Sequence, residues 1–192
     1  MRGIEQIPWL YDLGMHFMPR IARWRRELAV LACGDVLEIG CGTGQMLPLY
    51  REATGVVAFD PNRASLDRAR RRCPGAGLLV ADAQRMPFAD ASFDTVVSGL
   101  VFCSVPDAER GLAEVRRVLR PGGRLLMLEH VHASGRFGRW LLDAMQPPWT
   151  WITGGCHPNR DTESVVRQAG FRIESEHYRA RGLMRRFVAR TT

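Results

Sequence analysis

The sequence predicts an α/β protein in which a mostly parallel β-sheet is covered by helices on both faces. Residues 35–44 (DVLEIGCGTG) read as a short buried strand that runs into a glycine turn and then into a helix. Apolar runs at 56–59, 78–80 and 93–97 follow, separated by segments long enough for helices or connecting turns. Strands that alternate with helices in this way are typical of parallel sheets, whose ligands bind at the carboxyl ends of the strands.

The glycine turn has a spacing that bears on function. Gly40, Gly42 and Gly44 allow a sharp turn and leave no side chain between the backbone and a ligand. The pattern is Gly-x-Gly-x-Gly with Gln45 after it, and not the Gly-x-Gly-x-x-Gly of dinucleotide-binding folds. This spacing argues against a dehydrogenase.

Three acidic residues fall near the carboxyl ends of neighbouring predicted strands: Glu38, Asp60 and Asp82. Asp60 comes about twenty residues after the glycine turn, where an acidic residue accepts hydrogen bonds from a ribose in nucleotide-binding folds. Carboxylates would repel a pyrophosphate, but they suit an adenosine that carries a positive sulfonium and an ammonium group. The acidic residues therefore indicate S-adenosylmethionine as the ligand.

Taken in order, these motifs resemble those of the class I S-adenosylmethionine-dependent methyltransferases. The resemblance is carried by VLEIGCGTG at 36–44, DPN at 60–62, ADA at 81–83 and LRPGG at 119–123. It implies a Rossmann-like sheet of seven strands, mostly parallel, with an antiparallel hairpin at the C-terminal edge and helices on both faces. The residues expected to bind the cofactor are Tyr11, Glu38, Gly40, Cys41, Gly42, Gly44, Asp60, Pro61, Asp82, Ala83 and Ser98.

Four further stretches narrow the resemblance. LVFCSV at 100–105, EHV at 129–131, QPPW at 146–149 and GGCH at 154–157 are similar to small methyltransferase-like proteins that include the animal alkyl-thiol S-methyltransferases. The surroundings also resemble ubiquinone and menaquinone C-methyltransferases. The resemblance implies methyl transfer to a small apolar acceptor, with a thiol sulfur as the favoured nucleophile. The alternatives are a quinone precursor, a phospholipid head group, or a module that binds S-adenosylmethionine without turnover.

Composition limits the other classes of function. All 27 basic residues are Arg and the net charge is +7, but the arginines are scattered without an aromatic–basic repeat, so we do not expect nucleic-acid binding. With 46% hydrophobic and 24% charged residues, the chain of 192 residues reads as one globular domain. No apolar run approaches a membrane span, and no signal peptide is expected. The five cysteines lack paired spacing, which favours a reducing cytoplasm over a disulfide framework. We expect a monomer or a weak dimer.

Residues 1–32 are predicted to form an N-terminal lid and helix. Tyr11 is the candidate lid contact over the methionine end of the cofactor, and the alternative is that it packs on the edge of the core. A helix at 19–31 has apolar residues at three- and four-residue spacing. We expect its basic face to be solvated, with a peripheral contact to an anionic membrane as the alternative. The arginines of that face are Arg20, Arg23, Arg25 and Arg26.

Residues 131–160 form a predicted insertion that carries the substrate lid. A short helix at 140–145 would cover the substrate pocket, and its Trp and Met side chains argue for an apolar acceptor. The alternative is that these side chains only extend the core. Other predicted elements are helices at 45–53, 62–73, 106–119 and 162–169, a strand at 124–129, and a closing hairpin of 171–178 with 183–189.

Methyl transfer from a sulfonium depends mainly on alignment and desolvation, so no universal catalytic side chain is expected. His130 directly follows the fifth strand and is the first candidate for a general base, with His157 second. The alternative for His130 is a histidine hydrogen-bonded to the lid. Cys103 and Cys156 with His157 could suggest a metal, but they lack the closely paired spacing of zinc sites, so no metal is expected.

Overall fold

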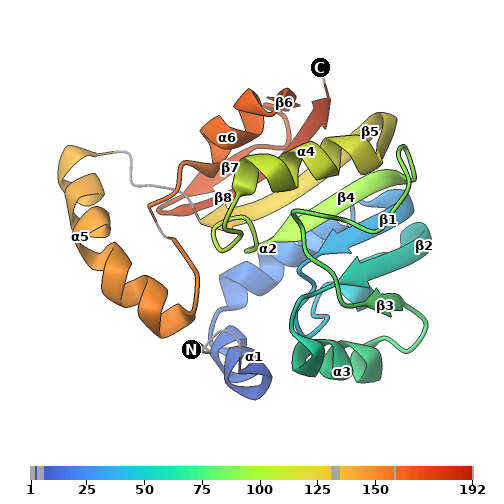
Figure 1. Ribbon diagram of the computed structural model, residues 1–192, viewed down its shortest axis with the longest axis horizontal. Coiled ribbons are helices and arrows are strands. Elements are labelled where there is room, and N and C mark those ends of the chain that lie inside the picture. Colours follow the sequence, from blue (N-terminus) through green and yellow to red (C-terminus); the bar gives the residue numbers. More distant parts are fainter. Residues whose placement is uncertain (1–2, 4–6, 131–134, 158, 192) are drawn as a thin grey trace.

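The computed structural model describes residues 3, 7–130, 135–157 and 159–191. Its centre is an eight-stranded sheet with the order β3-β2-β1-β4-β5-β8-β6, and β7 pairs with β8 beside this path (Figure 1). The strands are β1 Cys33–Ile39, β2 Glu52–Phe59, β3 Gly77–Leu79, β4 Phe93–Gly99, β5 Leu119–His130, β6 Phe171–Ile173, β7 Arg179–Arg181 and β8 Met184–Thr191.

Strands β1 to β5 pair in parallel, whereas β8 runs antiparallel to β5, β6 and β7. The prediction of a mostly parallel sheet with an antiparallel C-terminal part is confirmed, but the predicted count of seven strands is wrong by one. The difference lies in the closing hairpin. The half of β8 near Thr191 pairs with β6, and the half near Met184 pairs with β7, so two short strands share one edge of β8.

Helices cover both faces of the sheet, as predicted. On β5, Leu125 and Met127 join a core with α4 and α6, whereas Leu126 and Leu128 join a second core with α2 and α3. This alternation follows from the period of two residues along a strand, and it is the reason why β5 reads as a continuous apolar run. The helices are α2 Pro19–Ala29, α3 Arg63–Arg72, α4 Ala108–Val118 and α6 Thr162–Gln168.

The helix predicted at 45–53 is not present. A single 3-10 turn, η2 (Leu47–Leu49), is followed directly by β2. Cys33 at the start of β1 pairs with Glu52, so the chain must return along the whole length of β1. Seven strand residues span about 23 Å, whereas a nine-residue helix would span only about 14 Å. The connection at 40–51 is instead made of turns and bends around this single 3-10 turn.

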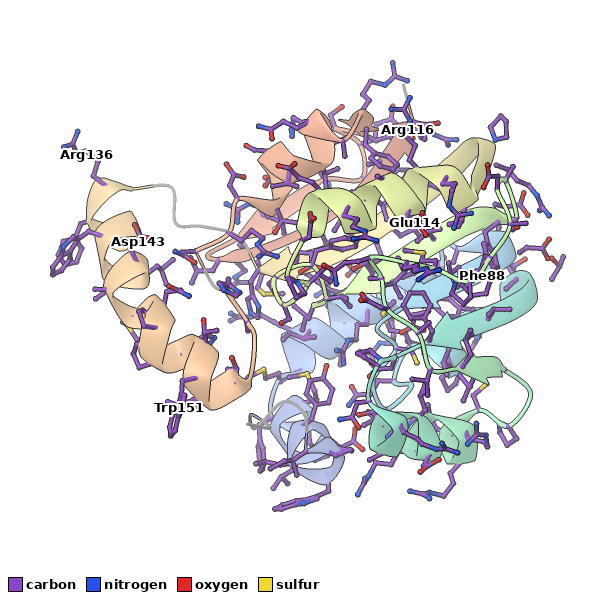
Figure 2. The ribbon with its side chains drawn as sticks, in the orientation of Figure 1. Phe88, Glu114, Arg116, Arg136, Asp143 and Trp151 are labelled. Atoms are coloured by element: carbon purple, nitrogen blue, oxygen red, sulfur yellow. The ribbon has the colours of Figure 1, made fainter. Side chains whose placement is uncertain are left out.

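The short helix predicted at 140–145 is part of a longer helix, α5 (Arg136–Thr153), of 18 residues. It stands apart from the sheet in Figure 1 and ends at Gly154, which has the left-handed conformation. The side chains of Trp140 and Trp151 are 63% and 66% exposed, and Trp151 points away from the sheet in Figure 2. Helix α1 (Pro8–His16) packs against α2 and α3. None of the helices in the described part of the chain is long and apolar enough to cross a membrane.

Candidate cofactor and acceptor site

The glycine loop after β1 needs glycine for two different reasons. Gly40 and Gly42 have φ values of +57° and +53°, a conformation that other residues rarely adopt. A Cβ atom at Gly40 would lie only 2.7 Å from the Val101 side chain. A Cβ atom at Gly42 would meet nothing within 4 Å, because Gly42 faces a cavity. The loop thus packs closely on one side and leaves room for a ligand on the other.

A cavity of about 680 Å³ lies at the carboxyl ends of β1, β2 and β4. A second cavity of about 220 Å³ adjoins it, and the two share Gly40, Asp60, Pro61 and Leu100 in their linings. The first is also lined by Tyr11, Gly42, Thr43, Asn62, Arg63 and Gly99, and the second by Phe59, Asp82, Ala83, Val101 and Ser104. The combined space is of the size that binds cofactors.

Asp60 connects the glycine loop to the start of α3. One of its carboxylate oxygens accepts a hydrogen bond from the backbone N–H of Gly42 at 2.9 Å, and the other accepts one from the N–H of Asn62 at 2.8 Å. Burial raises the pKa of Asp60, although these two N–H groups act in the opposite direction. The side chain of Asn62 caps α3 by accepting a hydrogen bond from Ala64 N–H.

Glu38 is buried below the glycine loop, only 4% exposed. The hydroxyl of Tyr50 donates a hydrogen bond to it at 2.9 Å. Burial raises the pKa of Glu38 to about 8, with a smaller upward contribution from Asp60, while Tyr50 and Arg25 lower it. A positive group bound nearby would favour the charged form of this carboxyl.

Tyr11 lies on α1 and lines the main cavity, as expected for the lid contact. Its hydroxyl accepts a hydrogen bond from Arg25 at 2.6 Å, and Arg25 also bonds to Gln45 in the glycine loop. Arg25 is only 5% exposed, so it does not belong to the solvated basic face expected for this helix. The Arg25 guanidinium points inward, and its two hydrogen bonds join α1 to the glycine loop.

Asp12, next to Tyr11, was missed as a functional residue by the sequence reasoning. One oxygen accepts hydrogen bonds from Thr43 at 2.6 Å and Gln45 at 2.9 Å, and the other pairs with Arg68 at 3.1 Å. Asp12 therefore fixes α1 to both the glycine loop and α3. Its place directly after Tyr11 was a signal in the sequence, but its partners could not be predicted because they lie far along the chain.

Some of the residues predicted to bind the cofactor do not line the two cavities. Ser98 is fully buried, and its hydroxyl donates to Glu129 at 3.1 Å, so Gly99 and Leu100 line the cavity in its place. Gly44 does not line either of the two cavities described above. A Cβ atom there would lie 2.8 Å from the Cβ atom of Ala69, which makes Gly44 a packing residue. Cys41 is buried beside Glu38 and Gly42 in a small pocket.

Glu129 organises the loop that follows β4. It is fully buried at the end of β5, and one of its oxygens accepts hydrogen bonds from the N–H groups of Val101 at 2.9 Å and Phe102 at 3.0 Å. The other accepts from Cys103 N–H at 3.4 Å. Burial raises the pKa of Glu129, while these N–H groups and His130 lower it. This carboxyl holds the loop that lines both cavities.

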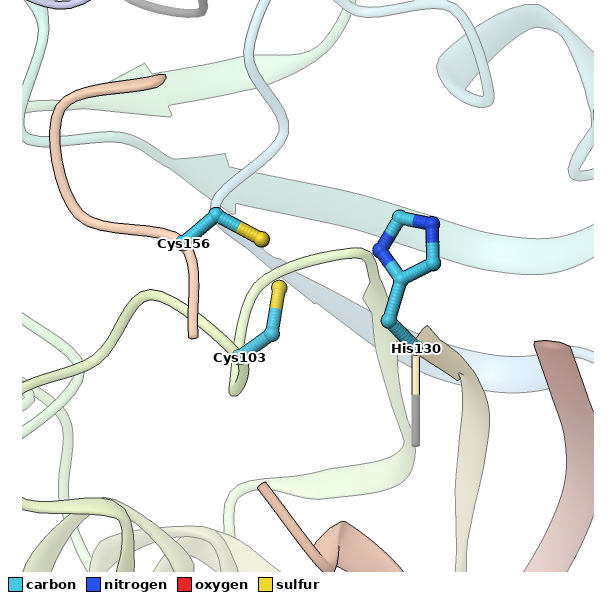
Figure 3. Close-up of side chains that lie close together, drawn as sticks. All are labelled: Cys103, His130 and Cys156. Carbon is cyan, nitrogen blue, oxygen red and sulfur yellow. The ribbon is translucent and has the colours of Figure 1, made fainter. Parts of the chain in front are cut away.

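The loop after β4, the end of β5 and the turn after α5 bring three reactive side chains together. The sulfur atoms of Cys103 and Cys156 and a ring nitrogen of His130 all lie within 4.8 Å of one another (Figure 3). The two sulfurs point toward each other, and the imidazole faces them. The hydrogen bond from Cys103 and the nearby His130 lower the pKa of the Cys156 thiol, whereas the same hydrogen bond and burial raise that of Cys103. His157 contributes a backbone bond to this region, from its N–H to Cys103 O at 2.8 Å.

Comparison with known proteins agrees with this geometry. Residues 37–127 match a family described as a methyltransferase domain. The fold is shared with a crystal structure of a SAM-dependent methyltransferase, possible histamine N-methyltransferase, from Thermotoga maritima. The TM-score is 0.70 at 24% identity, over 96% of this chain and 97% of that one. The chain therefore has the fold of the class I S-adenosylmethionine-dependent methyltransferases, and its residues 37–127 are similar to a methyltransferase domain.

Within that class, the chain is similar to thiol S-methyltransferase TMT1A of Homo sapiens. The two are 34% identical over 155 residues, which cover 76% of this chain and 64% of the relative. It is also 39% identical over 142 residues to the ubiquinone/menaquinone biosynthesis C-methyltransferase UbiE of Desulfotalea psychrophila, covering 66% of this chain and 58% of that one. The chain thus spans about six-tenths of the length of these relatives.

The described residues fit S-adenosylmethionine, the cofactor of this class. The cavity borders the glycine loop, and the open space beside Gly42 leaves room for a ligand against the backbone. Asp60 lies where the ribose is expected, and Glu38 offers a buried carboxyl for a positive group. Asp82 and Ala83 line the adjoining cavity.

Proposed function

We propose that the protein transfers the methyl group of S-adenosylmethionine to the sulfur of a small apolar thiol. The choice of a thiol as the acceptor rests on one observation, which is that side chains from separate stretches of the chain lie close together. Three of the stretches that resemble thiol S-methyltransferases are 100–105, 129–131 and 154–157. Their described residues Cys103, His130 and Cys156 meet at the carboxyl edge of the sheet. These stretches lie outside the cofactor motifs, so their resemblance concerns the acceptor side.

When bound, S-adenosylmethionine supplies a methyl group on a positively charged sulfur. The chain's own residues orient the cofactor and exclude water, which are the main requirements of this reaction. The glycine loop and Asp60 border the cofactor cavity, Glu38 lines a small pocket beside it, and Tyr11 borders both from α1. Gly99 and Leu100 line the cavity only a few residues before Cys103.

A thiol acceptor must lose its proton to become a good nucleophile. His130, at the end of β5, is the first candidate base, and His157 is the second. His130 is partly exposed beside two buried sulfurs, so an acceptor can approach it from solvent. If either histidine acts as the base, its replacement by Ala lowers thiol turnover while cofactor binding stays intact.

The alternative acceptors are a quinone precursor or a phospholipid head group. The exposed apolar side chains of α5 favour this alternative, because Trp and Phe side chains on a helix surface suit the boundary of a lipid bilayer. Helix α2 is a weaker candidate for this contact than its sequence indicated, since Arg25 points inward. The protein would then work at a membrane surface and not free in the cytoplasm, which is the location we propose for the thiol enzyme.

The test is release of S-adenosylhomocysteine from the full chain with S-adenosylmethionine and a panel of acceptors. The panel contains alkyl thiols, phenols, quinols and phosphatidylethanolamine liposomes, and the methylated product is identified by mass. We expect turnover with alkyl thiols. Turnover only with quinols or liposomes would contradict the thiol proposal and support the alternative. Cofactor binding without turnover of any acceptor would favour a non-catalytic module.

A further inference from the structure

We propose that Cys103, His130 and Cys156 bind a zinc ion, and that the fourth position of this ion takes the thiolate of the methyl acceptor. The second half of this inference rests on the proposed function, whereas the metal site stands on the structure alone. The sequence pointed to the two cysteines but paired them with His157 and not with His130, because the three residues are separated by 27 and 26 positions and lie in the loop after β4, at the end of β5 and in the turn after α5.

The set of ligand atoms selects the kind of metal. Two thiol sulfurs and one imidazole nitrogen are soft or borderline ligands, which suit zinc and exclude magnesium and calcium. In a tetrahedral zinc site with Zn–S bonds of about 2.3 Å, the sulfurs lie about 3.8 Å apart. The three atoms here all lie within 4.8 Å of one another, so a small inward rotation of the side chains would complete the geometry.

Backbone hydrogen bonds hold the two cysteines in place. Cys103 N–H donates to Glu129, and Cys103 O accepts from His157 N–H at 2.8 Å. Cys156 N–H donates to the Thr153 hydroxyl at 3.3 Å. Ligands fixed by such bonds lose little entropy on binding a metal.

Charge supports a divalent cation at this place. Glu129 is fully buried one residue before His130, and its carboxyl group accepts a hydrogen bond from Cys103 N–H. Both sulfur atoms belong to side chains that are only 2% exposed. A divalent cation bound here would compensate the negative charge of this buried carboxyl group and of the sulfurs that bind the ion.

Three protein ligands leave one position of a tetrahedral zinc ion open, as in catalytic zinc sites. His130 is the partly exposed member of the set, so the open position can be reached from solvent. The acceptor thiol releases its proton to water when its sulfur binds the zinc. A sulfur electron pair then forms the new C–S bond to the methyl group as the sulfonium C–S bond breaks, and the electrons of that bond remain on the departing thioether.

The first experiment measures metal in the full chain, purified under reducing conditions without a histidine tag or chelator. We expect about one zinc per chain, falling to a small fraction in Cys103→Ser and in His130→Ala. The matched control is Cys73→Ser, a partly exposed cysteine after α3, which should keep the zinc. Cys156→Ala serves as a second sulfur variant if Cys103→Ser does not fold, as judged by circular dichroism.

The second experiment replaces zinc by cobalt, whose visible bands report tetrahedral geometry and whose near-ultraviolet bands report bound sulfur. Addition of 1-butanethiol should strengthen the sulfur bands of the cobalt protein. A wild-type protein without zinc or cobalt bands would overturn the metal site, as would a Cys103–Cys156 disulfide in a non-reduced mass spectrum. Bands unchanged by 1-butanethiol would overturn the acceptor role.

The same measurements separate this inference from the proposed function. Thiol turnover by a chain stripped of its metal would overturn the acceptor role of the zinc and leave the proposed function intact. Bound zinc without thiol turnover would support the site and contradict the function. The cysteine variants also distinguish a zinc-ligand role of His130 from a general-base role. If His130 is a zinc ligand, both cysteine variants lose activity together with the histidine variant.

Discussion

The buried carboxyl group of Glu38 couples the stability of the fold to pH. Its pKa is raised by burial from an ordinary value of 4.5 to about 8, so the folded chain keeps a proton that the unfolded chain releases between these values. This contribution to stability is complete below pH 4.5 and is lost as the pH rises through 8. The burial of Glu38 therefore lowers the stability of the folded chain at alkaline pH.

Replacement of Glu38 by Gln should remove this dependence, because the amide can still accept the Tyr50 hydrogen bond but carries no charge. Between pH 6 and 8.5, the free energy of unfolding of the wild type should fall by about 2.5 kcal/mol more than that of the variant. Urea unfolding at both pH values, without cofactor, measures the difference. Parallel pH profiles for the two proteins would show that Glu38 keeps its charge in the folded state.

Asp12 joins the lid helix to the glycine loop through Thr43 and Gln45, without belonging to the motif series. Asp12→Ala should weaken S-adenosylmethionine binding by roughly tenfold, because two hydrogen bonds that fix the loop are lost. Isothermal titration calorimetry measures this. The control is Asp90→Ala, which breaks an exposed pair with Arg117 and should bind the cofactor as the wild type does. Equal affinities for all three proteins would contradict the role of Asp12.

At the scale of elements, the sequence predicted the strands and the capped helices well, because periodicity and caps are local. Asn62 caps α3 and Asp161 caps α6 through their side chains, each within its own helical turn. The connection after Gly44 was mispredicted because its conformation depends on the length of β1, which a local pattern does not contain. Most of the predicted cofactor residues line the cavities at the carboxyl edge of the sheet, whereas the contacts of Asp12 and of the Cys103 cluster join distant segments of the chain.

Helix α5 has an apolar surface that does not belong to either core. Trp140 and Trp151 are both more than 60% exposed. Replacing both by Ser should change the free energy of unfolding by less than about 1 kcal/mol, since exposed side chains contribute little. Leu112→Ala, at a fully buried position of α4, should cost about 2–5 kcal/mol. Chemical denaturation compares the two. A large loss in the Trp variant would mean that α5 packs against the protein in solution.

Across the whole molecule, β8 divides its side chains between two separate cores. Phe187 is fully buried against α4 and α6, whereas Val188 packs on the other face with α2 and α3. Although adjacent in sequence, Phe187→Ala and Val188→Ala should destabilise additively to within about 0.5 kcal/mol, because they share no packing partners. Urea unfolding of the two single variants and the double variant measures the coupling. A coupling above about 1 kcal/mol would indicate that the two layers respond as one.

The position of β8 between β5 and β6 also has a consequence for biosynthesis. Arg124 of β5 pairs with Arg190, so one edge of β5 lacks its neighbour until the ribosome has released residues far downstream. An open strand edge on a nascent chain is prone to pair with other chains. Proper folding of this protein in the cell thus depends on how the edge of β5 is shielded during translation.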